Sequence, residues 1–200
     1  NADLKDLARY DVFMIGDVPA DTLGPTVLRK IADRVEQGAG LLMTGGYHSF
    51  GPGGYANTPL ENLIPVVMRA NEKQAGNAIA KDLHYFQDLK MVPTSLGLQR
   101  YVMQLDSSRE ANRQKWNMLA PLKGANRLKK RFDTVEVLAE SAGNEAIPLL
   151  FASDVGNARV MAFAGDTTFQ WFLTGNRNEH ERFWRQMILW LAHKENETDQ

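Results

Sequence analysis

The sequence predicts a three-layer α/β sandwich in which a largely parallel sheet ends in an antiparallel edge. Three observations support this fold class: a strand–helix–strand pattern over residues 11–44, a hairpin pattern over 147–164 and an amphipathic helix over about 178–193. Strands that alternate with helices form parallel sheets covered by helices, and a late hairpin adds antiparallel strands at one side.

The first unit opens with an apolar run at residues 11–16, bounded by turn residues, which predicts a buried strand. Thr26 can cap the helix that follows, and Gly38 and Gly40 end it. Residues 41–44 form the next buried strand, so a right-handed crossover and parallel pairing are expected. The apolar positions of the helix recur at helical spacing: Val27, Leu28, Ile31 and Val35.

The remaining elements are predicted from shorter patterns. Residues 70–98 are weakly patterned and predict no element. The closing helix carries one wide apolar stripe, which predicts that it packs on the sheet. Further helices are expected at 60–64 and 107–116, and strands at 101–105, 135–139, 147–152 and 159–164, with a turn at 154–158.

Composition indicates one globular domain over residues 1–200, with 70–98 as a poorly defined excursion. The chain is 44% hydrophobic and 24% charged, and its net charge of −1 gives no general reason to bind nucleic acid or an anionic membrane. The basic residues at 123–131 are interpreted as a solvated loop. No apolar stretch is long enough to span a bilayer and no signal peptide is visible. The first residue, Asn1, and the polar tail at 194–200 predict a fragment of a longer protein.

The chain contains no cysteine. This excludes a disulfide, a cysteine-ligated metal and a thiol nucleophile, although it does not identify the compartment. The spacing H-E-x-x-H is also absent, because Arg182, Phe183 and Trp184 follow His180 and Glu181. We therefore predict neither a metal nor a cofactor.

A glycine-rich loop follows the strand at 41–44, where ligands bind in open α/β sheets. Its glycine amides could approach an anion or an oxyanion closely. Its side chains could line a pocket, or they could pack over the end of the sheet as in an Ω-loop. A phosphate-binding P-loop is excluded because the Gly-Lys-Ser/Thr ending is missing. The pocket candidates are Gly45, Gly46, Tyr47, His48, Ser49, Phe50 and Tyr55.

Five segments resemble a bacterial family named for glutamine amidotransferases. These are residues 10–20, 38–55 (GAGLLMTGGYHSFGPGGY), 58–65, 159–171 (RVMAFAGDTTFQW) and 180–186. The resemblance implies a class I glutamine amidotransferase-like fold with a flavodoxin-like sheet, related to the ThuA-like proteins of trehalose utilisation. Members often occur in large membrane-anchored proteins with a von Willebrand A domain, so the resemblance implies such a parent and such a partner domain.

Amidotransferase chemistry is not expected. Class I enzymes use a Cys–His–Glu triad whose cysteine lies on a G-x-C-x-G elbow, and neither that elbow nor a G-x-S-x-G substitute is present. Gly165, Asp166 and Thr167 stand where a His-Pro-Glu sequence would follow a late strand. Only Gly45 and Gly46 resemble the family's oxyanion loop. We therefore predict no catalytic residue and a non-catalytic domain that serves binding or assembly.

The predicted contact surface also includes residues after the last strand and in the closing helix. Asp166 and Thr167 either cap a helix or face a ligand crevice. Trp171 either packs in the core or stacks on a ligand or partner. His180 is a further ligand candidate, although it forms no natural dyad with Glu181 because adjacent helical residues point about 100° apart. His84 and His193 are interpreted as isolated surface residues.

Two competing hypotheses remain. One is a hydrolase or carbohydrate-acting enzyme of ThuA-like type that uses Asp166, His48 and His180, which requires these side chains to converge. The other is a structural spacer, which requires Tyr47, Phe50 and Tyr55 to fill the crevice. The binding hypothesis requires an open crevice with a polar floor.

Overall fold

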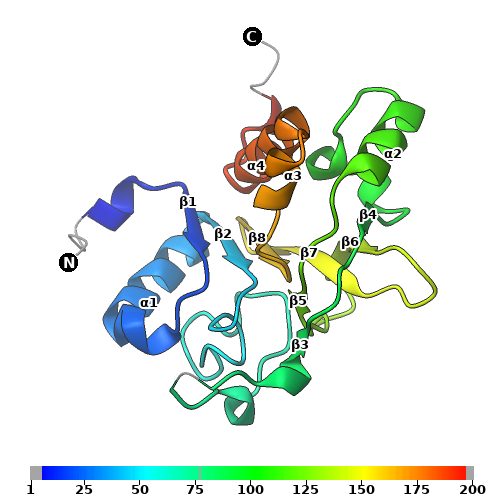
Figure 1. Ribbon diagram of the computed structural model, residues 1–200. Coiled ribbons are helices and arrows are strands. Elements are labelled where there is room, and N and C mark those ends of the chain that lie inside the picture. The colour runs from blue at the N-terminus through cyan, green and yellow to red at the C-terminus, as the bar shows by residue number, and fades with distance from the viewer. Residues whose placement is uncertain (1–5, 77, 197–200) are drawn as a thin grey trace.

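The computed structural model describes residues 6–76 and 78–196 and contains a six-stranded sheet between layers of helices (Figure 1). The predicted polar tail lies outside the described residues from position 197 onward. The sheet has the order β1-β2-β8-β7-β6-β4. Its strands are β1 (Val12–Ile15), β2 (Gly40–Thr44), β4 (Met91–Pro93), β6 (Glu136–Ser141), β7 (Pro148–Val155) and β8 (Ala158–Phe163).

The predicted α/β class is confirmed. β1, β2 and β8 pair in parallel, whereas β7, β6 and β4 extend the sheet through antiparallel pairs. The predicted hairpin is present as β7 and β8, and Gly156 in its turn adopts a φ of 58°. β6 runs in the same direction as β8, so four of the six strands point the same way.

Side chains of alternate strand residues enter two separate cores. On β2, Leu41 and Met43 face α1 (Ala20–Glu36), whereas Leu42 faces the layer formed by α2 (Arg109–Met118), α3 (Phe169–Leu173) and α4 (Arg177–Leu191). The loop after β2 packs beside α1 and completes that layer. The predicted stripe of the closing helix is buried at Phe183, Met187 and Leu191, which lie in the α4-side core.

The weakly patterned excursion contributes to a second, two-stranded sheet. β3 (His84–Tyr85) pairs antiparallel with β5 (Ala125–Asn126). The amide of Asn126 donates to the carbonyl of Ala164 at 2.9 Å, directly beyond the end of β8. This small sheet therefore lies at the carboxyl end of the main sheet, in the lower part of Figure 1.

The remaining ordered segments of the excursion and its flanks are short 3-10 helices. They contribute little regular hydrogen bonding, which explains the weak sequence pattern there. Their bounds are Asp6–Arg9, Ala70–Glu72, Lys81–Leu83, Gly97–Gln99 and Tyr101–Met103.

Three local predictions are wrong. The first helix begins at Ala20 rather than Thr26. It is broken at Gly24, which adopts a non-helical φ of 76° immediately before Pro25. Residues 60–64 form turns rather than a helix. Residues 101–105 form a 3-10 turn instead of a strand, because side chains take the carbonyls that a strand would pair. The indole of Trp116 donates to Met103 O at 3.0 Å, and the Gln186 amide donates to Tyr101 O at 2.8 Å.

None of the helices in the described part of the chain is long and apolar enough to cross a membrane. The basic residues at 123–131 are largely engaged by neighbours. Lys123 pairs with Asp88, Lys130 with Asp133, and Arg127 lies over the ring of Tyr85. These contacts fit the interpretation of a surface segment. That the domain does not bind nucleic acid stays a prediction.

Candidate functional site

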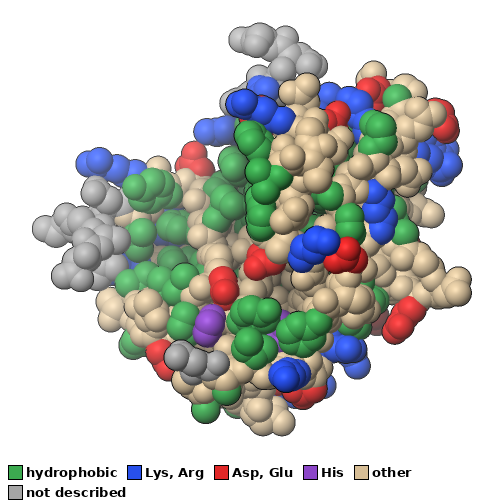
Figure 2. All heavy atoms as spheres, viewed as in Figure 1, with side chains coloured by type: hydrophobic (Ala, Val, Ile, Leu, Met, Phe, Trp, Pro, Cys, Tyr) green, Lys and Arg blue, Asp and Glu red, His purple; other side chains and the backbone are tan. Residues whose placement is uncertain are grey.

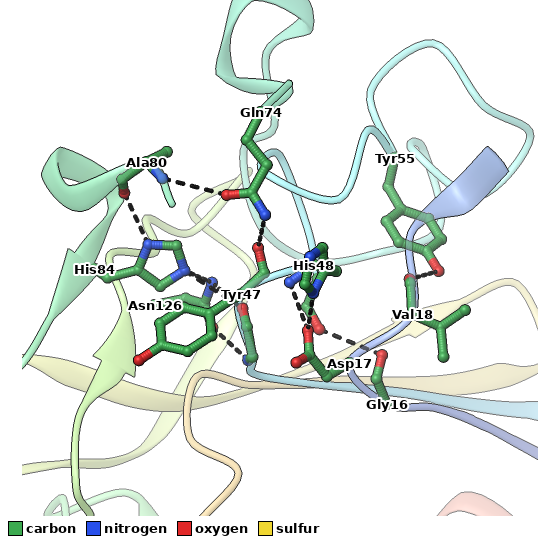
Figure 3. A network of polar contacts seen from close by, with 12 residues as sticks. Gly16, Asp17, Val18, Tyr47, His48, Tyr55, Gln74, Ala80, His84 and Asn126 are labelled. Carbon is green, nitrogen blue, oxygen red and sulfur yellow. Dashed lines mark hydrogen bonds and ion pairs between the residues drawn. The ribbon is translucent and has the colours of Figure 1, made fainter. Parts of the chain in front are cut away.

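The candidate site lies where the parallel strands end. β1, β2 and β8 run in the same direction, so the residues after Ile15, Thr44 and Phe163 meet at one edge of the sheet. β3 and β5 approach the same edge from the opposite side. Figure 3 shows the resulting polar network.

Asn126 holds Gly46 through a pair of hydrogen bonds. The Gly46 amide donates to Asn126 Oδ1 at 2.9 Å, and Asn126 Nδ2 donates to Gly46 O at 3.0 Å. The Gly45 amide donates to Gly165 O at 3.1 Å. Both glycine amides are therefore already bonded, and in this arrangement neither is free to bind an oxyanion.

His84 forms the floor of the site. It is only 5% exposed, so its interpretation as an isolated surface residue is wrong. Nδ1 lies 2.8 Å from Ala80 O and must donate to it, whereas Nε2 lies 3.1 Å from Asn126 Nδ2 (Figure 3). Because Gly46 fixes the orientation of the Asn126 amide, Nδ2 is the donor to Nε2. The imidazole proton is therefore on Nδ1.

His48 and Asp17 form a second contact pair at the edge. The Asp17 carboxylate accepts from the His48 amide at 2.5 Å, and its Oδ1 lies 3.3 Å from His48 Nδ1. Gly46 adopts a φ of +141°, and a Cβ there would lie 2.4 Å from Cγ of Asp17. The glycine therefore lets the loop pass close against the carboxylate.

A hollow of about 120 Å³ opens beside Gly46, His84 and Asn126. Asp166 lies on its rim and is exposed to solvent. Loss of hydration in this crowded edge, followed by the nearby Asp17 carboxylate, raises the pKa of the Asp166 carboxyl above its usual range. The side chains that line the hollow are those of Tyr47, His84, Tyr85, Phe86, Lys123, Asn126, Asp166 and Thr167.

We expect Asp166→Asn to stabilise the fold at neutral pH. A carboxyl whose pKa is higher in the folded than in the unfolded chain favours folding while it is protonated, and this contribution is lost as the pH rises through the folded pKa. Asparagine cannot ionise. The melting temperature of the variant should therefore exceed that of the wild type at pH 7 and equal it near pH 3, below the ordinary pKa of about 3.9. Asp133→Asn, at a fully exposed carboxylate, is the control. A variant melting below wild type at pH 7 would contradict the prediction.

Neither Asp166 nor Thr167 caps a helix. The N-cap position of α3 is Thr168, which forms no side-chain capping bond. Thr167 Oγ1 instead accepts from the amide of Lys123 at 2.9 Å, and this bond ties the end of β8 to the segment that leads into β5. Both residues line the hollow, as the crevice prediction requires.

Several predicted site residues pack rather than line the hollow. Ser49 and Phe50 are fully buried, and Ser49 Oγ donates to Gly16 O at 3.3 Å. Tyr55 is also buried, and its hydroxyl donates to Val18 O at 2.7 Å. Trp171 is buried, with its indole donating to Ala120 O at 2.8 Å, so it has no exposed ring for stacking. Tyr47, in contrast, is 42% exposed.

His180 lies apart from the hollow. Its Nε2 is 3.4 Å from Thr168 Oγ1, and its ring contacts Trp171, Phe172 and Trp184 between α3 and α4. Burial lowers the pKa of the His180 imidazole below its usual range. The structure brings His48 and Asp166 to one edge, and it places His180 in the packing of a helix pair instead. The ligand-binding roles of all these candidates stay predictions.

The polar side chains of Asp17, Gln74, His84 and Asn126 in this network were not predicted. Asp17 had a usable signal, because it directly follows a predicted parallel strand. His84 and Asn126 had none, since the two-residue strands that carry them leave no periodic pattern. Among the described residues, no group of three or more His, Cys, Asp or Glu side chains is arranged to hold a metal ion.

A larger hollow of about 860 Å³ lies at the other end of the sheet. Both of its arginines are already paired, Arg100 with Glu136 and Arg159 with Glu195. Arg159 also stacks on Trp190, 4.9 Å from the ring centroid. The smaller hollow therefore remains the better candidate, since it combines the strand ends with the buried polar floor.

Comparison with known proteins supports the fold. No protein-family profile matches the chain, and no curated protein matches it. Among solved structures, a ThuA-like protein from Bacteroides uniformis aligns with a TM-score of 0.53 and 11% identity, over 92% of this chain and 72% of the other. The chain has a ThuA-like fold.

Two Salmonella typhimurium proteins align over more of this chain. Cytoplasmic protein STM1381 is 27% identical, with a TM-score of 0.69, over 94% of this chain and 74% of the other. Cytoplasmic protein STM3548 is 22% identical, with a TM-score of 0.70, over 96% and 75%. These names state no activity. The von Willebrand A partner, the membrane-anchored parent and the non-catalytic role stay predictions.

Proposed function

We propose that this ThuA-like domain binds a small polar ligand at the carboxyl edge of β1, β2 and β8, and that it does not hydrolyse glutamine. One observation carries the proposal: an open hollow at the strand ends has a floor of buried polar side chains, His84 and Asn126. Ligand sites of open α/β sheets form at this edge. The absence of cysteine removes the nucleophile of class I amidotransferases.

The packing of the loop supports binding over a purely structural spacer. Phe50 and Tyr55 are buried in the α1-side core, and they leave the hollow open instead of filling it. The loop after β2 is also held in one conformation by hydrogen bonds. Gln74 Nε2 donates to Tyr47 O at 2.7 Å, and Gln74 Oε1 accepts from the Ala80 amide at 3.2 Å. A wall that is already rigid loses little conformational entropy when a ligand binds, so the entropic cost of binding is smaller.

A nuclear magnetic resonance titration tests the binding. Glucose, glutamine, glutamate and choline are titrated separately into ¹⁵N-labelled protein. We expect at least one probe to shift the Gly46 amide and the Asn126 side-chain amide signals while leaving Gly156, in the distant β7–β8 turn, unchanged. If none of the four probes moves the signals of the hollow, the proposed function is wrong. In parallel, ammonia release from glutamine should not exceed the protein-free rate, and clear turnover would refute the non-catalytic assignment.

Acid–base catalysis at the same edge is a second candidate function, favoured by the contact between His48 Nδ1 and Asp17 Oδ1. A carboxylate that orients a histidine can prepare it as a general base, and Asp166 lies at the same edge of the sheet. The candidate is a hydrolase acting on a hydroxylated substrate through activated water. Hydrolysis of 4-nitrophenyl glucosides that is lost in His48→Gln would support it.

A further inference from the structure

The hollow at the carboxyl edge has a wall of exposed aromatic rings. Tyr47 and Phe86 stack with ring centroids 6.5 Å apart and an interplanar angle of 28°, and His84 meets Tyr47 edge to face at 5.4 Å. Tyr47 is 42% exposed and Phe86 53% exposed, so part of each ring remains open to solvent. Exposed aromatic faces attract organic cations through the ring quadrupole.

The lining of the hollow carries one carboxylate, Asp166, and one ammonium, Lys123. Asp166 lies on the rim, and Asp17 packs against Gly46 beside it. The ammonium of Lys123 is held by both oxygens of Asp88, at 2.9 and 3.1 Å, and among the described residues no lysine or arginine forms an ion pair with Asp166. Figure 2 shows acidic and histidine side chains close to hydrophobic ones on this face.

The floor offers few free hydrogen-bond donors. One hydrogen of Asn126 Nδ2 is given to Gly46 O and the other to His84 Nε2. The Gly46 amide is given to Asn126 Oδ1, and His84 Nδ1 to Ala80 O. An anion or a neutral polyol needs donors from the protein, whereas an ammonium group needs only carboxylates, carbonyls and π faces.

We propose that the hollow binds the head group of an organic cation, a primary or quaternary amine, against the Tyr47 and Phe86 rings and beside the Asp166 carboxylate, with Asp17 behind Gly46 as a second negative charge. This inference rests on the proposed function and names its ligand class. The volume of about 120 Å³ fits a head group, since sites for drug-sized ligands are roughly 300–1,000 Å³. Such a ligand would offset the repulsion between the two carboxylates.

Choline and 3,3-dimethyl-1-butanol test the charge requirement, because they have nearly the same shape and only choline is charged. Each is titrated into the full chain by calorimetry and by the resonance assay above, with glucose as a neutral polyol. We expect choline to bind at least about tenfold more tightly than the butanol. Asp17→Asn/Asp166→Asn and Tyr47→Ala/Phe86→Ala should each weaken choline binding about tenfold or more. Phe132→Ala, at a 57% exposed ring elsewhere, should leave it unchanged.

The outcomes separate the two proposals. Equal binding of choline and the butanol, unchanged choline binding in both double variants, or binding of glucose without choline would overturn the cation assignment and leave the proposed function standing. Absence of binding by every probe would overturn both. Circular dichroism checks that each variant is folded. The four substituted side chains are exposed, so their replacement leaves the core intact.

Discussion

Replacing Trp171 with alanine is expected to lower the free energy of unfolding by about 3–5 kcal/mol. Trp171 on α3 is fully buried against α2 and α4, and its ring meets Trp116 and Phe183 edge to face at 5.8 and 5.4 Å. Truncation would leave a large cavity and remove both aromatic contacts. It would also leave the carbonyl of Ala120 without the indole donor that it has at 2.8 Å.

The matched control is Leu173→Ala on the same short helix. Leu173 is 70% exposed, so its removal should change the stability by less than about 0.5 kcal/mol. Chemical denaturation of both variants, followed by fluorescence and circular dichroism, gives the two values. A loss below about 1 kcal/mol for Trp171→Ala would mean that this aromatic cluster is not the closely packed core described above.

Gly45→Ala is expected to cost about 3 kcal/mol or more, or to prevent folding. A Cβ at position 45 would lie 2.1 Å from the carbonyl oxygen of Ala164 and 2.8 Å from Asn126 Oδ1. The first of these atoms belongs to the backbone at the end of β8 and cannot rotate away. The strand ends would have to separate, which would break the bond from the Gly45 amide to Gly165 O.

Gly16→Ala provides the comparison, because Gly16 follows β1 as Gly45 follows β2. A Cβ there meets only Thr44 Oγ1, at 3.9 Å, which is an ordinary contact. We expect this variant to melt within a few degrees of the wild type. If both alanine variants were equally stable, the close approach of the two strand ends would be wrong. Soluble expression of Gly16→Ala beside loss of folded Gly45→Ala would agree with the prediction.

The parts of the fold that sequence predicts are those in which local pattern and burial agree. The apolar run of β2 has one interpretation, since both faces of this strand are covered, and β1 is defined by its buried Phe13 and Ile15 although Met14 is 46% exposed. The closing helix is similarly defined by its apolar stripe. The strand prediction for residues 101–105 is wrong for a specific reason. The alternation of these residues resembles a strand, but the side chains of Trp116 and Gln186 bind the carbonyls of Met103 and Tyr101.

The site is predicted less completely than the fold. Part of its polar network comes from segments whose apolar residues show no helical or strand periodicity. Positions 45–48 follow a buried strand, and the rule for strand ends finds them. His84 reaches the floor only because Ala80 and Asn126 orient it, contacts that span 4 and 42 residues of sequence. The sequence does not distinguish whether Phe50 lines a pocket or packs in the core, because aromatic residues in a glycine-rich loop suit both roles. The structure shows it fully buried in the core.

The small β3–β5 ribbon carries both fixed and exchangeable positions around the hollow. His84 and Asn126 are buried and hydrogen-bonded to the loop after β2, so they belong to the scaffold. Phe86 and Lys123 beside them are exposed on the lining of the hollow. Libraries restricted to these two exposed positions would be the economical route to new specificities on this framework.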